Sequence, residues 1–245
     1  MPPGCAFTSD AKMARRALLS KMNPVLSCQA LCCHRMNWNE GEQAFIRDVT
    51  LFFDSATLCV FDGPDSSGRG LLLNILGLLE PADSGTIFLN GQSVTDIPEE
   101  NLRRFRNETF GFLFQNPCLL PSFSVAENVA MPLFRICGTD AAAARERTFE
   151  VLDFCGIAHL EKQLAGRLVP SAQRRAALAR ALVHRPRILI ALSPRGGDEL
   201  FDLAIRTAEE LGLCVLWAGG DGGLGRKAQR VIQMRDGRIS SDQRL

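Results

Sequence analysis

The stretch Phe61–Leu79, with the sequence FDGPDSSGRGLLLNILGLL, decides the fold. It overlaps the end of an apolar run, Thr57–Phe61, which has the composition of a buried strand. Three glycines follow within eight residues, and a leucine-rich segment that we expect to be helical continues to Pro81. One face of this helix would carry Leu71, Leu72, Ile75, Leu76 and Leu79. Strand, glycine-rich loop and helix in this order predict a phosphate-binding loop, where backbone amides and the helix N-terminus hold anionic oxygens.

The chemistry of this loop departs from the usual pattern, G-x-x-x-x-G-K-[ST]. Gly63 and Gly68 hold the two glycine positions, but Arg69 stands where a lysine reaches the phosphates. Gly70 stands where a hydroxyl would bind Mg²⁺, and glycine has no oxygen to offer. Arginine keeps the positive charge, although its planar fork is not equivalent to an ammonium group. Taken alone, the stretch is equally consistent with an ordinary strand-to-helix turn.

If the loop binds nucleotide, its contacts come from one continuous segment. The candidate residues are Gly63, Pro64, Asp65, Ser66, Ser67, Gly68, Arg69, Gly70 and Leu71. Asp65 places a negative charge inside the loop, where it would repel a phosphate group.

Composition bounds the remaining possibilities. The chain has 245 residues, an apolar fraction of 46%, a charged fraction of 22% and a net charge of +1. These values suit one or two soluble domains, and the small net charge gives no broad positive electrostatic field that would attract nucleic acid. No apolar run approaches the roughly 20 residues of a membrane span. The nine cysteines are expected to be reduced, and the cluster around Cys28–His34 lacks C-x-x-C spacing, so we assign no metal ligand.

The pattern of elements predicts an α/β fold. Residues 1–24 form a polar, basic extension that we expect to be disordered, with a membrane-surface or targeting role as the alternative. Residues 25–240 form the domain, a helical region occupies about 124–170, and residues 241–245 are a tail.

The expected strands are Val25–Cys33, Ala44–Phe53, Thr57–Phe61, Gly85–Leu89, Phe110–Phe114, Arg187–Leu192, Leu213–Trp217, and the hairpin Val231–Met234 with Arg238–Ile239. The expected helices, besides the one after the loop, are Pro98–Asn107, Ala141–Cys155, a helix capped by Ser171 that runs to about His184, and Asp198–Leu211. The early strands suggest an antiparallel patch beside a largely parallel sheet.

The order of these features resembles the ATP-binding subunits of ATP-binding cassette (ABC) transporters. The resemblance is strongest to those that serve lipoprotein release, macrolide export and similar FtsX-like permeases. It spans about Val25–Ile239 and rests on the segments RDVTLFF, GLLEPADSGTIFLNGQSV, RRFRNETFGFLFQNPCLLPSFSVAENVAMPL, AQRRAALARALVHRPRILIAL and VIQMRDGRI. It implies a P-loop nucleotide-binding domain with a RecA-like core, an antiparallel β patch and a helical subdomain. It also implies ATP and Mg²⁺ as cofactors, a permease partner, a homo- or heterodimer, and a cytoplasmic location at the inner face of the membrane.

Carried over residue by residue, the resemblance keeps one functional side chain and loses the others. Gln115 matches the glutamine that touches the Mg²⁺–water shell and senses the permease. The signature L-S-G-G-Q is replaced by LVPSA at Leu168–Ala172, and the Asp-Glu-Pro motif by Leu192-Ser193-Pro194. Gly220 stands in place of the switch histidine. The chain has no tyrosine to stack on adenine; Met36 takes that position and Trp38 is the alternative.

We therefore expect an ABC subunit whose ATP binding is weakened or lost and whose hydrolysis is defective, with no catalytic residue assigned. Two other interpretations stay open. One is a regulatory or scaffolding pseudo-ATPase without a transport role. The other is an active P-loop enzyme with unfamiliar residues, although Asp198, Glu199 and Asp221 read better as solvated acids than as replacements. Whether Mg²⁺ binds is also left open.

Overall fold

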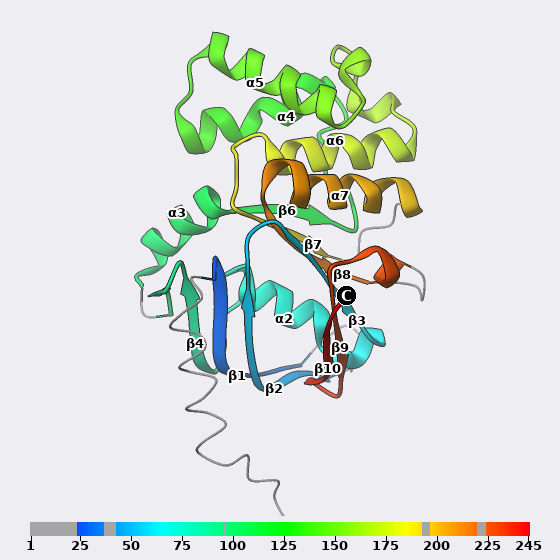
Figure 1. The fold of residues 1–245 in the computed structure, drawn as a ribbon. Coiled ribbons are helices and arrows are strands. Elements are labelled where there is room, and N and C mark those ends of the chain that lie inside the picture. Colours follow the sequence, from blue (N-terminus) through cyan, green and yellow to red (C-terminus); the bar gives the residue numbers. More distant parts are fainter. Residues whose placement is uncertain (1–23, 37–42, 96, 193–196, 220–223) are drawn as a thin grey trace, which may run out of the picture.

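The computed structural model describes residues 24–36, 43–95, 97–192, 197–219 and 224–245. Figure 1 shows a layered α/β body, with a group of helices at one end and a smaller sheet at the other. The larger sheet has six strands in the order β10-β9-β3-β8-β7-β6, and the smaller has four in the order β2-β1-β4-β5.

The six-stranded sheet is parallel except at one edge. β3 lies at its centre and pairs in parallel with β8 and β9, while β7 pairs in parallel with β8 and β6. Only β10 runs antiparallel, as the partner of β9 in the predicted hairpin. The strands are β3 (Thr57–Asp62), β6 (Phe110–Phe114), β7 (Ile188–Leu192), β8 (Cys214–Ala218), β9 (Arg230–Arg235) and β10 (Arg238–Arg244). β10 therefore continues through most of the segment that was expected to be a tail.

The four-stranded sheet is the predicted antiparallel patch. β1 pairs with both β2 and β4, and β5 pairs with β4 across the turn at Asn90 and Gly91. Both turn residues have positive φ, 48° and 78°, which asparagine and glycine tolerate best. The strands are β1 (Leu26–Met36), β2 (Gln43–Phe53), β4 (Ser84–Leu89) and β5 (Gln92–Ser93).

Alternation along the parallel strands divides the core into two layers. In β3, Leu58 and Val60 pack with the helical end of the molecule, whereas Cys59 and Phe61 pack with α2 and the smaller sheet. Figure 1 shows α6 and α7 on one side of the sheet and α2 on the other. Both faces of the strands are covered, which explains their continuous apolar sequence.

The helices are α2 (Arg69–Leu76), α3 (Glu99–Thr109), α4 (Val125–Pro132), the π-helical turn Leu133–Cys137, α5 (Ala141–Phe154), α6 (Pro170–Leu182) and α7 (Gly197–Leu211). Short 3₁₀ turns occupy Asp65–Ser67, Ala158–Leu160, Ala165–Arg167 and Leu224–Lys227.

Two predicted helix boundaries were wrong. α2 ends at Leu76 with Gly77 as its C-cap, so Leu79 lies beyond the helix; the chain has already turned at Leu78, where φ is 58°. Ser171 does not cap α6, because Val169 is the N-cap and Pro170 is the first helical residue. Proline suits that position, where its fixed φ is helical and its missing N–H would have no partner.

No helix in the described ranges is long and apolar enough to cross a membrane.

Candidate nucleotide site

The predicted strand, loop and helix are present. β3 ends at Asp62, and the chain turns through Gly63 and a 3₁₀ turn before α2 begins after Gly68. Gly63 and Gly68 have φ of 137° and 88°, which side-chain-bearing residues rarely adopt. A Cβ at Gly63 would lie 2.3 Å from the carbonyl oxygen of Met234, and one at Gly68 would lie 2.7 Å from that of Phe45. Both glycines are therefore required by backbone conformation and by close packing.

Neighbouring elements hold the loop from outside. The Asp62 carboxylate accepts a 2.8 Å hydrogen bond from the backbone N–H of Gly63. The backbone N–H of Gly237, in the β9–β10 turn, donates to the carbonyl oxygen of Ser67 at 3.1 Å. The carbonyl of Gly237 in turn accepts from the N–H of Arg47 at 2.8 Å. The loop conformation is thus fixed by the hairpin and by β2.

The loop retains donors that suit an anion. The first N–H groups of α2, from Arg69 to Leu71, have no acceptor within the helix. The Ser67 side chain is fully buried, and its hydroxyl has no hydrogen-bond partner among the described residues. This hydroxyl lies 3.2 Å from the position that a Cβ on Gly63 would take, so it faces the inside of the loop. These groups fit a phosphate oxygen.

The same loop lacks the hydroxyl ligand that the P-loop pattern offers to Mg²⁺. Gly70 supplies no oxygen, and the space where its Cβ would stand has no atom within 4 Å. Among the described residues, no group of three or more His, Cys, Asp or Glu side chains could hold a metal ion. The position that should bind the metal is therefore open space.

The Arg69 side chain is engaged within the loop itself. Its Nη1 donates to the carbonyl oxygen of Gly63, and its Nη2 pairs with Oδ1 of Asp65. The Arg69 side chain is only 13% exposed, whereas that of Asp65 is 94% exposed. The cation that would be expected to meet phosphate is bonded to a carbonyl and a carboxylate of its own chain.

The sheet brings other predicted residues to the same edge. Phe61 pairs with Ala218, Trp217 with Ala191, and Leu192 with Phe114, so the carboxyl ends of β3, β8, β7 and β6 are aligned. This edge is where open α/β sheets bind their ligands. Gln115 follows β6 directly and is exposed, and Leu192 is the last residue of β7. Ser193, Pro194, Gly220, Asp221 and Trp38 lie outside the described residues, and Met36 is the last residue of β1.

The segment Leu168–Ala172, which was predicted to stand in place of the family signature, lies at the start of α6. Val169 is 62% exposed although it is apolar, and α6 has no side-chain cap. The next residue, Pro170, lacks an N–H, so this helix start offers fewer donors than one that begins with serine and glycine.

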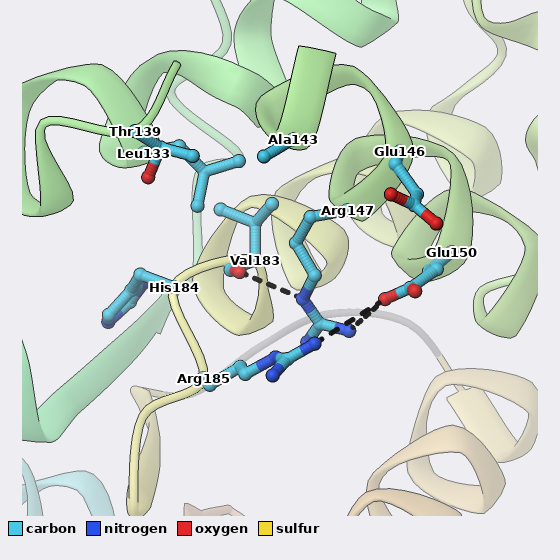
Figure 2. Close-up of a pocket in the computed structure, with 9 residues that line it drawn as sticks. All are labelled: Leu133, Thr139, Ala143, Glu146, Arg147, Glu150, Val183, His184 and Arg185. Atoms are coloured by element: carbon cyan, nitrogen blue, oxygen red, sulfur yellow. Dashed lines mark hydrogen bonds and ion pairs between the residues drawn. The ribbon is translucent and has the colours of Figure 1, made fainter. Parts of the chain in front are cut away.

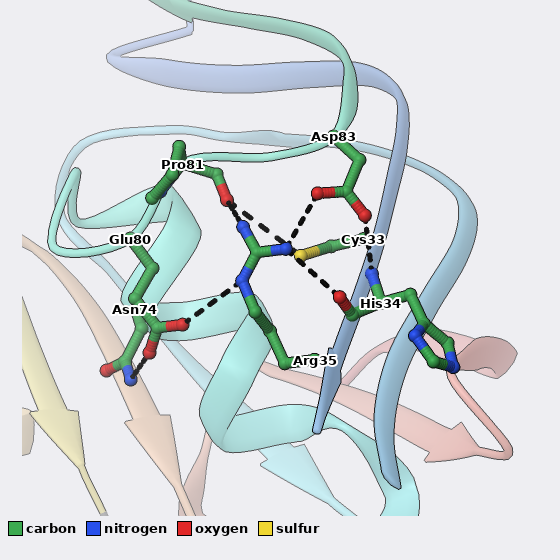
Figure 3. Close-up of polar contacts among 7 residues, drawn as sticks. All are labelled: Cys33, His34, Arg35, Asn74, Glu80, Pro81 and Asp83. Atoms are coloured by element: carbon green, nitrogen blue, oxygen red, sulfur yellow. Dashed lines mark hydrogen bonds and ion pairs between the residues drawn. The ribbon is translucent and has the colours of Figure 1, made fainter. Parts of the chain in front are cut away.

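A polar cluster that the sequence did not reveal joins β1 to the segment that follows α2 (Figure 3). Arg35 of β1 donates to the Asp83 carboxylate at 2.7 Å and to the carbonyl oxygen of Pro81 at 2.6 Å. The backbone N–H of His34 also donates to Asp83, at 2.7 Å. The hydrogen bond from Arg35 is the largest of the causes that hold the pKa of Asp83 below its usual value, and the bond from the His34 backbone is the next. Because these partners are 46 to 49 residues apart, no local pattern could have indicated them.

A second candidate site is a cleft of about 320 Å³ between the helical region and the turn from α6 to β7 (Figure 2). Arg147 crosses it, donating to the carbonyl oxygen of Val183 at 3.1 Å and to Glu150 at 2.8 Å. The Nε2 of His184 lies 3.1 Å from the carbonyl oxygen of Phe110, and burial lowers the pKa of His184. The lining residues are Leu133, Thr139, Ala143, Glu146, Arg147, Glu150, Val183, His184 and Arg185.

The fold and the loop together define a nucleotide-binding domain of the P-loop class. The family model described as ABC transporter matches residues 46–194. The chain is 32% identical to the lipoprotein-releasing system ATP-binding protein LolD of Bacteroides thetaiotaomicron, over 82% of this chain and 95% of that protein. It is 36% identical to LolD of Bordetella pertussis, over 80% of this chain and 87% of that protein. The chain belongs to the ABC transporter family, as an ATP-binding subunit.

Solved structures agree on the fold. The dimeric bacterial ABC transporter cassette MJ0796 superposes with a TM-score of 0.78 at 24% identity, covering 90% of this chain and 98% of that one. The cassette cbiO1 of Clostridium perfringens, part of the transporter complex cbiONQ, gives a TM-score of 0.79 at 22% identity, covering 91% and 89%. Both support the predicted α/β cassette architecture.

Proposed function

We propose that this chain is an ABC transporter subunit of the lipoprotein-release or macrolide-export type that binds ATP weakly and does not hydrolyse it. The observation that carries the proposal is the state of the phosphate loop. Its backbone has the required shape, but Arg69 is bonded to Gly63 and Asp65, and Gly70 leaves no ligand for Mg²⁺. ATP is the ligand that the family and the loop shape support, with low affinity and little help from the metal.

Hydrolysis is expected to fail for a separate reason. Phosphoryl transfer depends on a positioned metal, oriented water and charge stabilisation. Leu192 has no oxygen to orient a metal, and an unactivated hydroxyl such as that of Ser193 is a poor base near neutral pH. Gly220 replaces the switch histidine. Several independent contributions are lost together.

Calorimetry and a turnover assay test this proposal. Titration with Mg·ATP should give a dissociation constant no tighter than the high micromolar range, and the purified chain should release phosphate no faster than buffer. The variant Ser193→Glu should stay inactive, because Leu192, Gly70 and Gly220 remain. Sub-micromolar, Mg²⁺-dependent affinity, or turnover at about one per second, would show that the proposal is wrong.

The transport role requires a membrane partner. We propose that the chain works as a homo- or heterodimer of ATP-binding subunits on an FtsX-like permease, in the cytoplasm at the inner face of the membrane. The names of the LolD relatives support a releasing system with several parts. The cleft in Figure 2, with both charges and apolar side chains, suits a short amphipathic segment of that permease.

Co-purification with an FtsX-like permease from the same organism tests the docking. Glu146 is exposed and lines the cleft, so Glu146→Arg should reduce the recovered permease several-fold. Glu100→Arg, an equal change on the exposed start of α3, is the control and should leave recovery unchanged. Equal recovery with both variants would place docking elsewhere.

A second candidate function is favoured by the start of α6. With Val169 and Pro170 in place of serine and glycine, the chain cannot present the usual signature donors to a partner's nucleotide. This suits a regulatory or scaffolding pseudo-ATPase without a transport role. If the neighbouring gene encodes no permease, and none is recovered with the tagged chain from its own membranes, this second function is the better one.

A further inference from the structure

We propose that Asp65 is a built-in competitor of nucleotide, which together with the Gly63 carbonyl holds Arg69 in a clasp that must open before the loop can bind phosphate. The inference deepens the proposed function and rests on it, since it takes nucleotide as the ligand of the loop. It assigns the weak binding chiefly to one residue, Asp65, rather than to general decay of the site.

The clasp uses both arms of the guanidinium. Nη1 is directed to the carbonyl oxygen of Gly63 at the entrance of the loop, and Nη2 to the carboxylate of Asp65 in the 3₁₀ turn. Arg69 is nearly buried while Asp65 is almost fully exposed, so the carboxylate stands at the rim and the cation beneath it. An incoming phosphate meets a negative charge first, and the positive charge behind it is already paired.

Arginine suits this arrangement better than lysine does. Its planar fork can donate to two acceptors in fixed directions, whereas an ammonium is a compact point charge. A phosphate group could take the place of the carboxylate on the same fork, because carboxylate and phosphate oxygens are alternative partners of a guanidinium. The two anions therefore compete for one cation.

The remainder of the loop is preserved. The hydroxyl of Ser67 is buried without a partner among the described residues, and the first N–H groups of α2 point away from the helix body. Gly237 and Asp62 hold the loop backbone independently of Arg69. Removing the carboxylate should therefore release a formed anion site and not a collapsed one.

The test compares two neutralising substitutions near the loop. Asp65→Asn removes the competing charge with little change of shape. Asp236→Asn is the matched control, because Asp236 is 80% exposed and precedes Gly237, which bonds the loop, yet it pairs only with Arg235 among the described residues. Its φ of 49° is one that asparagine accepts. Calorimetry would use ATP in the presence of EDTA, and ATP with Mg²⁺.

We expect Asp65→Asn to bind ATP at least about tenfold more tightly than the unchanged chain, with or without Mg²⁺, since an exposed ion pair and a charge repulsion are both removed. Asp236→Asn should stay within about twofold of the unchanged chain, because Asp236 pairs with Arg235 and its neutralisation leaves the Arg69 clasp intact. The double variant Asp65→Asn/Arg69→Ala should lose most of the gain, because the released cation is its main source and only the smaller effect of the removed repulsion remains.

Two outcomes would overturn the clasp. The first is an unchanged ATP affinity in Asp65→Asn, with thermal unfolding showing that the variant is folded. The second is an equal gain of ATP affinity in Asp236→Asn, which would reveal a general charge effect. Both leave weak binding by the unchanged chain in place. Sub-micromolar binding by the unchanged chain would instead overturn the proposed function, so the two failures are distinguishable.

Discussion

Arg180 of α6 donates a 2.7 Å hydrogen bond to the carbonyl oxygen of Cys118, in the loop that follows Gln115. A second bond of 2.7 Å reaches the carbonyl oxygen of Pro117. Burial lowers the pKa of Arg180. α6 begins at the segment predicted to replace the signature, so one guanidinium joins that helix to the predicted glutamine loop. The position of α6 relative to this loop therefore depends in part on one side chain.

Replacing Arg180 by lysine should loosen the glutamine loop. A lysine cannot span both carbonyls in the same fork, so we expect a loss of about 1–3 kcal/mol and a melting temperature several degrees lower. Hydrogen exchange should rise in residues 116–120. Arg174→Lys, on the same helix and without a polar partner in the part of the chain that the structure describes, should change neither quantity. Unchanged exchange in Arg180→Lys would mean that the loop is held by its other contacts.

Gly70 offers a direct test of the missing metal ligand. Nothing lies within 4 Å of its Cβ position, so a serine should fit without displacing a neighbour. We expect Gly70→Ser to make ATP affinity depend on Mg²⁺, because the hydroxyl supplies the oxygen that the loop lacks. Gly70→Ala is the control: it should stabilise α2 by up to about 1 kcal/mol through helix propensity and leave the Mg²⁺ response flat. Calorimetry with and without EDTA would separate the two, and an equal response would contradict the assignment.

Local sequence patterns predicted most of the secondary structure. The bounds of β6 and the start of α5 agree with the expectation, because apolar runs and helical periodicity are local signals. The end of α2 was missed because Leu79 continues the leucine pattern after the backbone has already turned. The spacing of the leucines in this segment is the same on both sides of the turn, so it could not reveal where the helix ends.

The interactions that decide the site were less visible. The Arg69–Asp65 clasp spans a 3₁₀ turn and a helix start, where spacing alone does not show that two side chains meet. The partners of Arg180 are 62 and 63 residues away, so they depend on how α6 packs against the sheet. The sequence predicted which side chains the loop lacks, and the structure adds that the arginine of the loop is bonded to Gly63 and Asp65.

His184 should make stability depend on pH. Burial lowers its pKa below 6.5, so the folded state resists protonation that the unfolded chain accepts. The contribution of His184 to the free energy of unfolding is therefore fully present above about pH 6.5. It is lost as the pH falls from there towards the folded pKa, with a slope of at most about 1.4 kcal/mol per pH unit. Arg147 and Arg185 line the same cleft, and the positive charge of Arg147 also lowers the pKa of His184.

The measurement is urea unfolding between pH 5.5 and 7.5. His184→Gln should flatten the dependence, because an amide can still donate to the carbonyl of Phe110 and does not titrate. His159→Gln, on an exposed turn, should keep the slope of the unchanged chain. An identical slope in His184→Gln would assign the proton to another group.

Assembly with an intact partner tests the start of α6. If two subunits pair as proposed, one composite site uses the loop of this chain and the other sets the partner's phosphate loop against LVPSA at Leu168–Ala172. In the second site Val169 offers no hydroxyl and Pro170 no N–H. A hydrogen bond to a charged group contributes about 1.5–3 kcal/mol, so losing two should weaken closure by about a hundredfold or more.

We therefore expect this chain to suppress the ATPase activity of an intact partner on the permease, measured per partner subunit as the mixing ratio rises. The double variant Val169→Ser/Pro170→Gly should restore part of the partner's activity, since it returns a hydroxyl and an N–H to the start of α6. Ser171→Ala, at the next exposed position, is the control and should suppress as strongly as the unchanged chain. A mixed complex that runs at half or more of the rate of the intact homodimer would show that LVPSA serves as a signature, because a composite site lacking both donors could not close often enough to sustain that rate.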